Sequence, residues 1–491
     1  MVTETAPGLR LGTARGRGTL VAAVLASGMA FLDSTVVNVA LPKLGEDLHA
    51  EMSGLQWVVN GYTLTLAAFV LLGGALGDRF GRRRVFLIGV VWFALASVAC
   101  GFAPSIELLV FARIVQGVGA ALLVPGSLAM IQASFDPAER GRAIGAWSGL
   151  SGVSTAVGPF IGGWLIDSLS WRWIFFINIP LAVGVVLCAH WIPESRSLAA
   201  RNTRFDIAGS MLGALGLAGI TYALIAAPEH GLGSFTVLLP FLVGIACLIS
   251  FVQVEKRRGE PGVGHADRDG RPRRPAMLPP SLFTSRVFTL LNIYTLFVYG
   301  AFGGIFFFLV IQLQSVSGYS ALEAGIATLP ITLLLLIGSA QSGALATRIG
   351  PRPQLVLGPL LCAAGALLLH LVGPEADYIT RVLPGVLLFG LGLMALVAPL
   401  TSAVLAAVED EHAGVASGVN NTAARAASLL AVAALPLLVG LSGAAYANPV
   451  AFDHGFNQAL WWCAGLLVVG GVLALLVRVP GAGERPRRGQ D

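Results

Sequence analysis

The chain has 491 residues, of which 56% are hydrophobic and only 12% are charged. Soluble globular domains have about 25% charged residues, so this composition excludes a soluble domain and predicts a protein that crosses the membrane many times. The net charge of +5 does not indicate a nucleic-acid partner, because no basic patch on a folded face accompanies it.

Fourteen apolar runs are long enough to cross a bilayer. A helix rises about 1.5 Å per residue, so about 20 apolar residues span a hydrocarbon core of about 30 Å. The first run carries Asp33 and is longer than the apolar core of a signal peptide, so we expect it to be a retained first span. The runs lie near residues 19–41, 54–76, 85–103, 105–131, 143–166, 173–192, 207–227, 235–254, 287–313, 323–345, 354–372, 382–407, 414–441 and 457–477.

The basic residues between the runs predict the orientation, because Lys and Arg near span ends stay on the cytoplasmic side. Taken alternately, the loops on one side hold only Lys43, Arg172 and Arg381. We therefore expect both termini in the cytoplasm, as an even number of spans requires. The other side holds Arg10, Arg15, Arg17, residues 79–84, Arg140, Arg142, residues 196–204, residues 256–286, Arg348, Arg352 and the tail from Arg478.

Asp33 lies inside the first apolar run. An ionisable group within a span is costly and usually faces a cavity or a partner, so a proton-binding role is one hypothesis and a buried structural carboxylate is the other. Arg113 in the fourth run is at a similar depth, since each residue lies about eight residues, or about 12 Å, from the outer end of its span. The equal depth predicts either a proton-coupling pair or a static buried ion pair.

A charge-dense segment separates the second and third runs, and we expect it to be a loop at the membrane surface. Asp78 stands at the end of the second span, where its carboxylate can accept hydrogen bonds from a helix N-terminus or from an Arg of a neighbouring span. Such a bond would act as a latch that opens when the two halves of the protein rock. The arginines can equally serve only to fix the orientation of the loop at the cytoplasmic side. The loop residues with an expected gating role are Gly74, Asp78, Arg79, Gly81 and Arg82.

The fifth run contains a proline among glycines. Proline removes a backbone donor and kinks a helix, while glycines allow a neighbouring helix to approach closely. The pattern predicts a kinked, tightly packed helix that takes part in gating through Gly158, Pro159, Gly162 and Gly163.

Other polar side chains inside the runs are candidates for a substrate cavity. Arg425 is notable because it lies about 16 Å into its run. Glu323, at the start of the tenth run, is instead expected to be a helix N-terminal charge. The cavity candidates are Asn38, Gln56, Asn60, Tyr62, Gln116, Gln312, Asn420, Asn421 and Arg425.

These motifs resemble those of the major facilitator superfamily. The loop at 74–84 resembles its signature loop, and the 113–121 segment is similar to its fourth-span signature. The 31–42 and 417–425 segments resemble sequences of its fourteen-span drug:proton antiporter branch, and the 152–163 segment resembles its antiporter motif.

A weak internal repeat supports this resemblance, since residues 343–352 repeat the spacing of the signature loop, with Thr347 in place of Asp78. The resemblance implies an all-α polytopic membrane protein with two six-helix bundles plus two inserted helices, in the parallel-halves plan of the superfamily. The expected parts are a cytoplasmic tail at 1–18, bundles at 19–192 and 287–477, a linker with two inserted helices at 193–254, a cytoplasmic linker at 255–286 and a tail at 478–491.

The resemblance also implies a proton-coupled exporter, an antiporter of drugs or antibiotic-like small molecules that works by alternating access in the bacterial inner membrane. In that fold the first and fourth spans line one cavity, so Asp33 and Arg113 are expected to interact. The alternatives are an exporter of one endogenous metabolite or self-made antibiotic, and a membrane sensor that transports nothing.

We expect no enzyme, no cofactor and no metal, because the sequence lacks a nucleophile–base set, a metal cluster and a phosphate-binding loop. A gradient would then supply the energy. The expected partners are a small-molecule substrate, protons and the lipid bilayer, with the protein as a monomer.

Overall fold

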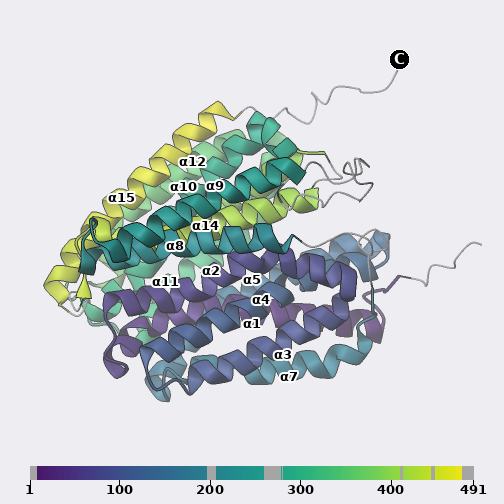
Figure 1. Ribbon diagram of the computed structural model, residues 1–491, viewed down its shortest axis with the longest axis horizontal. Helices are drawn as coiled ribbons and strands as arrows, with labels where there is room; N and C mark the ends of the chain where they lie inside the picture. The colour runs from purple at the N-terminus through teal and green to yellow at the C-terminus, as the bar shows by residue number, and fades with distance from the viewer. Residues whose placement is uncertain are drawn as a thin grey trace, which may run out of the picture.

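The computed structural model describes residues 8–195, 206–258, 278, 280–409, 413–443 and 448–477. These residues contain 14 helices that are long and apolar enough to cross a membrane. The helices form two bundles that lie beside each other, which confirms the predicted all-helical architecture (Figure 1). Most of the expected 255–286 linker and the 478–491 tail lie outside the described residues.

The first bundle contains six spans, and the sixth is not one continuous helix. It is interrupted at Ile177, where a short helix gives way to a second one. The helices are α1 (Ala14–Asp47), α2 (Met52–Phe80), α3 (Arg82–Gly101), α4 (Ile106–Ser134), α5 (Pro137–Ser168), α6 (Trp173–Phe176), α7 (Asn178–Cys188) and the 3-10 turn η1 (Ala189–Trp191).

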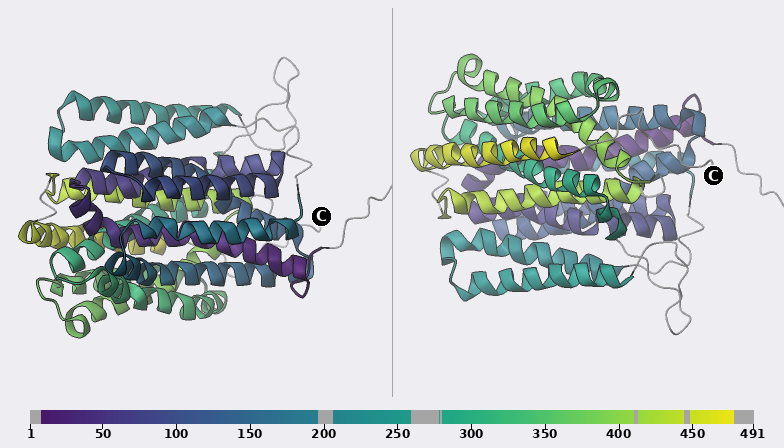
Figure 2. Two further views of the ribbon diagram at one scale, coloured as in Figure 1. Left: turned by 90° about the horizontal axis from the view of Figure 1, so that it is seen from below. Right: turned by 90° about the horizontal axis from the view of Figure 1, so that it is seen from above.

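The second bundle and an inserted helical pair complete the fold. The second bundle contains α10 (Arg286–Ser315), α11 (Ala321–Ile349), α12 (Arg352–Leu368), α13 (Leu383–Ala406), α14 (Ala413–Leu438) and α15 (Pro449–Leu476), with short turns at Leu369–Leu371 and Tyr378–Val382. The inserted pair is α8 (Ile207–His230) and α9 (Phe235–Arg258), which lie together at one edge of the molecule (Figure 2).

Local chemistry fixes where the helices begin. α2 and α3 meet at Gly81, whose φ of +113° is a conformation that favours glycine. A Cβ atom added there would lie 2.6 Å from Oε1 of Glu194. At the start of α11, Ser320 and Glu323 form a reciprocal capping box, which confirms that Glu323 is a helix N-terminal charge.

The two ends of the bundles differ in charge. The face where α1 begins and α2 meets α3 carries Arg15, Arg17 and Arg82, and we call it the basic face. The face where α1 ends and α11 begins is called the opposite face.

The bundles meet along two seams. α5 packs against α11 on one side, and α2 packs against α14 on the other. α8 lies against both α2 and α14, and Trp57 of α2 contacts Tyr222 of α8 with ring centroids 6.4 Å apart. Of the inserted pair, α8 therefore covers the second seam, and α9 packs on α8.

The α5–α11 seam is tightly closed toward the opposite face. Asp167, near the end of α5, accepts hydrogen bonds from the backbone N–H groups of Ala321 (3.2 Å) and Leu322 (2.8 Å) with its two carboxylate oxygens. A Cβ atom added at Gly163 would lie 2.5 Å from the Ala321 carbonyl oxygen, and one added at Gly325 would collide with the Pro159 carbonyl oxygen. The two helices therefore touch backbone to backbone.

Amide side chains join the bundles at the same face. Gln314 Nε2 of α10 donates to the Val39 carbonyl of α1 at 2.9 Å, and Gln56 Nε2 of α2 donates to the Val432 carbonyl of α14 at 2.7 Å. Toward the basic face, Cβ atoms added at Gly145, Gly149 and Gly152 of α5 would meet no described atom within 4 Å. The close contacts between α5 and α11 given above thus lie toward the opposite face.

Candidate functional site

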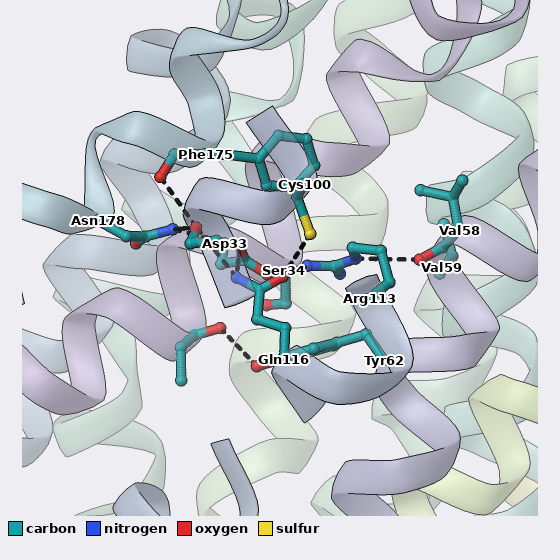
Figure 3. A network of polar contacts seen from close by, with 12 residues as sticks. Asp33, Ser34, Val58, Val59, Tyr62, Cys100, Arg113, Gln116, Phe175 and Asn178 are labelled. Atoms are coloured by element: carbon teal, nitrogen blue, oxygen red, sulfur yellow. Dashed lines mark hydrogen bonds and ion pairs between the residues drawn. The ribbon is translucent and has the colours of Figure 1, made fainter. Parts of the chain in front are cut away.

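Asp33 and Arg113 form an ion pair in the middle of the first bundle (Figure 3). Arg113 Nη1 lies 2.5 Å from Asp33 Oδ2, and each of the two residues is only 1% exposed. Removing two charges from water is costly unless each is well paired and hydrogen-bonded. Neutral side chains and a backbone carbonyl form further hydrogen bonds with both members of the pair.

A set of neutral polar groups completes the shell of the Asp33 carboxylate. Its Oδ1 accepts hydrogen bonds from Gln116 Nε2 at 2.8 Å and from Asn178 Nδ2 at 3.3 Å. Both amides also donate to Ser97 Oγ, at 3.3 and 2.9 Å. The Ser97 hydroxyl in turn donates to the Phe175 carbonyl at 2.9 Å. Five helices, α1, α3, α4, α6 and α7, thus contribute to one hydrogen-bond network around this carboxylate.

The Arg113 guanidinium has further partners of its own. Its Nε donates to the Val58 carbonyl at 3.1 Å, and its Nη1 also donates to Gln116 Oε1 at 2.7 Å. Its Cζ lies 4.3 Å from the centroid of the Tyr62 ring, a distance typical of cation–π contacts. The Tyr62 hydroxyl donates to the Ala30 carbonyl of α1 at 3.3 Å. The cation is therefore held from α2 and α4 as well as by Asp33.

Two members of this cluster, Ser97 and Asn178, were not among the sequence candidates. Asn178 is the first residue of α7, directly after the break at Ile177, and it is fully buried. An amide two residues before Pro180 within an apolar run was the available signal. Ser97 had no distinguishing signal, since serine is common in membrane helices.

Most other candidate cavity residues lie away from Asp33. Asn38 Nδ2 bonds to the Ser34 carbonyl at 3.4 Å within α1, and Asn60 is fully buried in α2 with no hydrogen-bond partner for its amide atoms among the described residues. Gln312 donates to the Val372 carbonyl at 2.8 Å and to Asp453 Oδ1 at 2.6 Å. Gln312 therefore belongs to a polar group near the opposite face of the second bundle.

The three candidate side chains on α14 point in two different directions around the helix. Asn420 Nδ2 donates to Thr295 Oγ1 of α10 at 2.7 Å, inside the second bundle. Arg425 Nε donates to Asn421 Oδ1 at 2.9 Å, and Asn421 is exposed.

The charge-dense loop is tied to its own bundle. Asp78 Oδ1 lies 2.7 Å from Arg82 Nη2 and accepts a bond from Arg82 Nε at 2.8 Å. The backbone N–H of Arg82 donates to the Ser195 carbonyl at 3.0 Å, and that of Arg83 donates to Glu194 Oε1 at 3.2 Å. Gly74 lies nearby on α2, where an added Cβ would be 3.7 Å from Pro125 Cβ of α4. The loop thus links α2 and α3 to the segment after the sixth span.

The glycines of α5 face two different helices. A Cβ atom at Gly158 would collide with Thr35 Oγ1 of α1, and one at Gly162 would lie 2.7 Å from Val36 Cγ1. Gly163 and Pro159 instead face α11, as described above. α5 is therefore pressed against α1, which carries Asp33, and against the other bundle at the same level.

The described residues contain no group of three or more His, Cys, Asp or Glu side chains that could hold a metal ion. Their five cysteines are all free. The Asp33 cluster therefore contains a buried carboxylate, an arginine, two amides, the Ser97 hydroxyl and the Cys100 thiol, which donates to Gln116 Oε1 at 3.5 Å.

Comparisons with known proteins place this geometry in a family. The sequence profile of the Major Facilitator Superfamily matches residues 23–432. The chain is 36% identical to the puromycin resistance protein pur8 of Streptomyces alboniger, over 93% of this chain and 90% of that protein. It is 34% identical to the tetracenomycin C resistance and export protein of Streptomyces glaucescens (87% and 76% covered) and 33% identical to the methylenomycin A resistance protein of Bacillus subtilis (92% and 94% covered).

Solved structures share the fold at low sequence identity. A bacterial homolog of the human lysosomal transporter Spinster, in an inward-facing and unoccupied conformation, matches with a TM-score of 0.64 and 17% identity, over 95% of this chain and 97% of that one. A POT family transporter in complex with 5-aminolevulinic acid matches with a TM-score of 0.66 and 14% identity, over 96% and 97%. The fourteen spans, the profile match and the resistance-protein relatives together identify the chain as a member of the major facilitator superfamily of the multidrug efflux type.

Proposed function

We propose that this protein is a proton-coupled antiporter that exports drug-like or antibiotic-like small molecules across the bacterial inner membrane by alternating access. The observation that carries the proposal is the buried Asp33–Arg113 pair, whose carboxylate is held by amides from α4 and α7. Relatives whose names refer to puromycin, tetracenomycin C and methylenomycin A resistance support the export role.

The proposed cycle starts from a state that is closed at the opposite face and open at the basic face. The α5–α11 contacts of Asp167 and Gly325 support closure, and the bias of basic residues supports a cytoplasmic basic face. Substrate enters from the cytoplasm, the bundles rock, and a proton from outside binds Asp33. Neutralising this carboxylate removes the charge that fixes Arg113, which loosens the contact between α1 and α4.

The gradient supplies the energy for this cycle. One proton that moves inward releases about 2.3 kcal/mol per 100 mV of membrane potential and about 1.4 kcal/mol per pH unit. A potential of ordinary size is therefore sufficient to move an uncharged molecule uphill by more than tenfold, since tenfold costs about 1.4 kcal/mol.

The test is transport into inside-out vesicles that contain the full-length protein. An imposed pH gradient, acid inside, should drive uptake of compounds from a chemically diverse panel, and a protonophore should abolish it. Uptake of only one compound class would favour the alternative, a dedicated exporter of one metabolite. If no compound of the panel shows gradient-dependent flux, the export function is contradicted. The remaining alternative is then a membrane sensor with the same fold that transports nothing.

The closed seam gives a separate prediction about gating. In the Gly325→Val variant, the new side chain would collide with the Pro159 carbonyl, so we expect the opposite face to open more often. Overpacking costs about 1 to 3 kcal/mol, which corresponds to a population shift of about 5- to 150-fold. Labelling of an added Asn38→Cys residue by an impermeant maleimide applied at the opposite face should rise accordingly, in a background without the native cysteines.

Gly213→Val is the matched control, because a Cβ atom at Gly213 of α8 would meet no described atom within 4 Å. We expect it to leave the labelling unchanged. Equal labelling of the Gly325→Val and Gly213→Val proteins would show that the α5–α11 contact does not limit opening.

A further inference from the structure

Only three charged side chains lie deep in the described helices. Asp33, Arg113 and Arg425 are the only Asp, Glu, Lys or Arg residues more than six positions from either end of a described helix. Asp33 and Arg113 neutralise each other as an ion pair. Arg425 is therefore left as a net positive charge near the middle of the membrane.

Few groups of the described residues compensate the positive charge of the Arg425 guanidinium. Its Nε donates to Asn421 Oδ1 at 2.9 Å, and it forms no ion pair with any described carboxylate. Its two terminal nitrogens have no hydrogen-bond partner among the described residues. A charged side chain at this depth usually pairs with an opposite charge or marks a substrate path.

The position of Arg425 on α14 directs it toward the seam between the bundles. Gly418, Asn421 and Arg425 follow each other at spacings of three and four, so they share one face of the helix. A Cβ atom at Gly418 would lie 2.7 Å from Leu71 Cδ2 of α2, so this face points at the other bundle.

The other side of α14 is occupied by contacts within its own bundle. Asn420 donates to Thr295, and Ser428 Oγ donates to the Tyr299 carbonyl of α10 at 3.0 Å. These bonds fix the rotation of α14 about its axis. Arg425 therefore stays on the seam side, the side on which Gly418 faces α2.

We propose that Arg425 binds an acidic group of the transported molecule, so that the substrates are amphiphiles carrying a carboxylate or an ionised phenol. This inference rests on the proposed export function and names its substrate class. The unused guanidinium donors match a carboxylate in geometry and charge. Since Arg425 lies about 18 Å from the start of α14, its depth favours a molecule inside the seam over a lipid headgroup at the surface.

The test compares two xanthene dyes of similar size, anionic fluorescein and cationic rhodamine 123. Their binding to the purified full-length protein in dodecyl maltoside is measured by fluorescence polarisation, without any gradient. We expect the wild type to bind fluorescein at least about tenfold more tightly than rhodamine 123, which corresponds to about 1.4 kcal/mol. Arg425→Gln should lose that preference, and Arg425→Lys should keep it.

Arg381→Gln removes an exposed positive charge near the opposite face and serves as the matched control, with fluorescein affinity expected to equal that of the wild type. Equal or tighter binding of rhodamine 123 by the wild type, or no fluorescein binding at all, would overturn the proposal even if Arg425→Gln failed to fold. Unchanged fluorescein affinity in a folded Arg425→Gln protein would also overturn it. So would displacement of the dye by phosphatidylglycerol but not by phosphatidylcholine, because Arg425 would then bind a lipid.

Binding and transport separate this inference from the export function. Arg425-dependent fluorescein binding without gradient-driven flux of any compound would support the anion site and contradict export. Gradient-driven flux of cationic compounds only, with Arg425→Gln unaffected, would support export and contradict the anion site.

Discussion

The Asp33→Asn variant is expected to insert and fold but to lose proton-driven transport completely. Asparagine keeps the shape of the side chain, yet it cannot bind and release a proton. Its oxygen can still accept the bonds from Gln116 and Asn178 that reach Oδ1 in the wild type. The variant therefore resembles the proton-bound state of the cycle, which the protein must tolerate in every turnover.

The measurement is the proton release from acid-loaded inside-out vesicles when substrate is added. Vesicles with Asp33→Asn should behave like vesicles without the protein, at equal protein level. Glu375→Gln, which neutralises an exposed acid near the opposite face, is the matched control and should release protons like the wild type. Wild-type coupling in Asp33→Asn would remove Asp33 from the mechanism.

Much of this architecture was predictable, because membrane spans can be recognised from the length and composition of the apolar runs. Fourteen apolar runs became fourteen helices, and a carboxylate and a guanidinium at equal predicted depth became a buried pair. Depth along a helix follows from residue counting at about 1.5 Å per residue.

The direction of a side chain around its helix was much harder to predict. A helix that is apolar on all sides has no polar face to indicate its rotation. Gln312 shows the effect: counting placed it within a span, and the structure pairs it with Asp453 of α15, far in sequence and away from Asp33. Asn178 was missed for a related reason, since its role depends on the break between α6 and α7.

Contacts between the two bundles also could not be predicted by counting residues along the spans. The bonds from Asp167 to Ala321 and Leu322 join residues more than 150 positions apart. In the sequence, Asp167 is an ordinary acidic residue near the end of an apolar run. Its hydrogen-bond partners on α11 follow only from the packing of α5 on α11. The same packing explains the glycines of α5, whose two neighbours, α1 and α11, belong to different bundles.

Loss of Arg113 is expected to have the largest effect on stability. Arg113→Gln leaves the Asp33 carboxylate buried with amide partners only, and breaking a buried ion pair from one side typically costs about 3 to 5 kcal/mol. The hydrogen bond to the Val58 carbonyl and the contact with the Tyr62 ring are lost as well. We therefore expect the free energy of unfolding of the full-length protein in bicelles to fall by an amount in this range.

The double variant Asp33→Asn/Arg113→Gln distinguishes a true pair from two independent residues. It has no uncompensated charge, so its loss of stability should be smaller than the sum of the two single losses. Contacting residues typically deviate from additivity by about 0.5 to 3 kcal/mol, and here the deviation should lie toward the upper end because both partners are 1% exposed. Strictly additive losses would mean that Gln116, Asn178 and the Val58 carbonyl hold each charge on their own, and the ion pair would then contribute nothing to the fold.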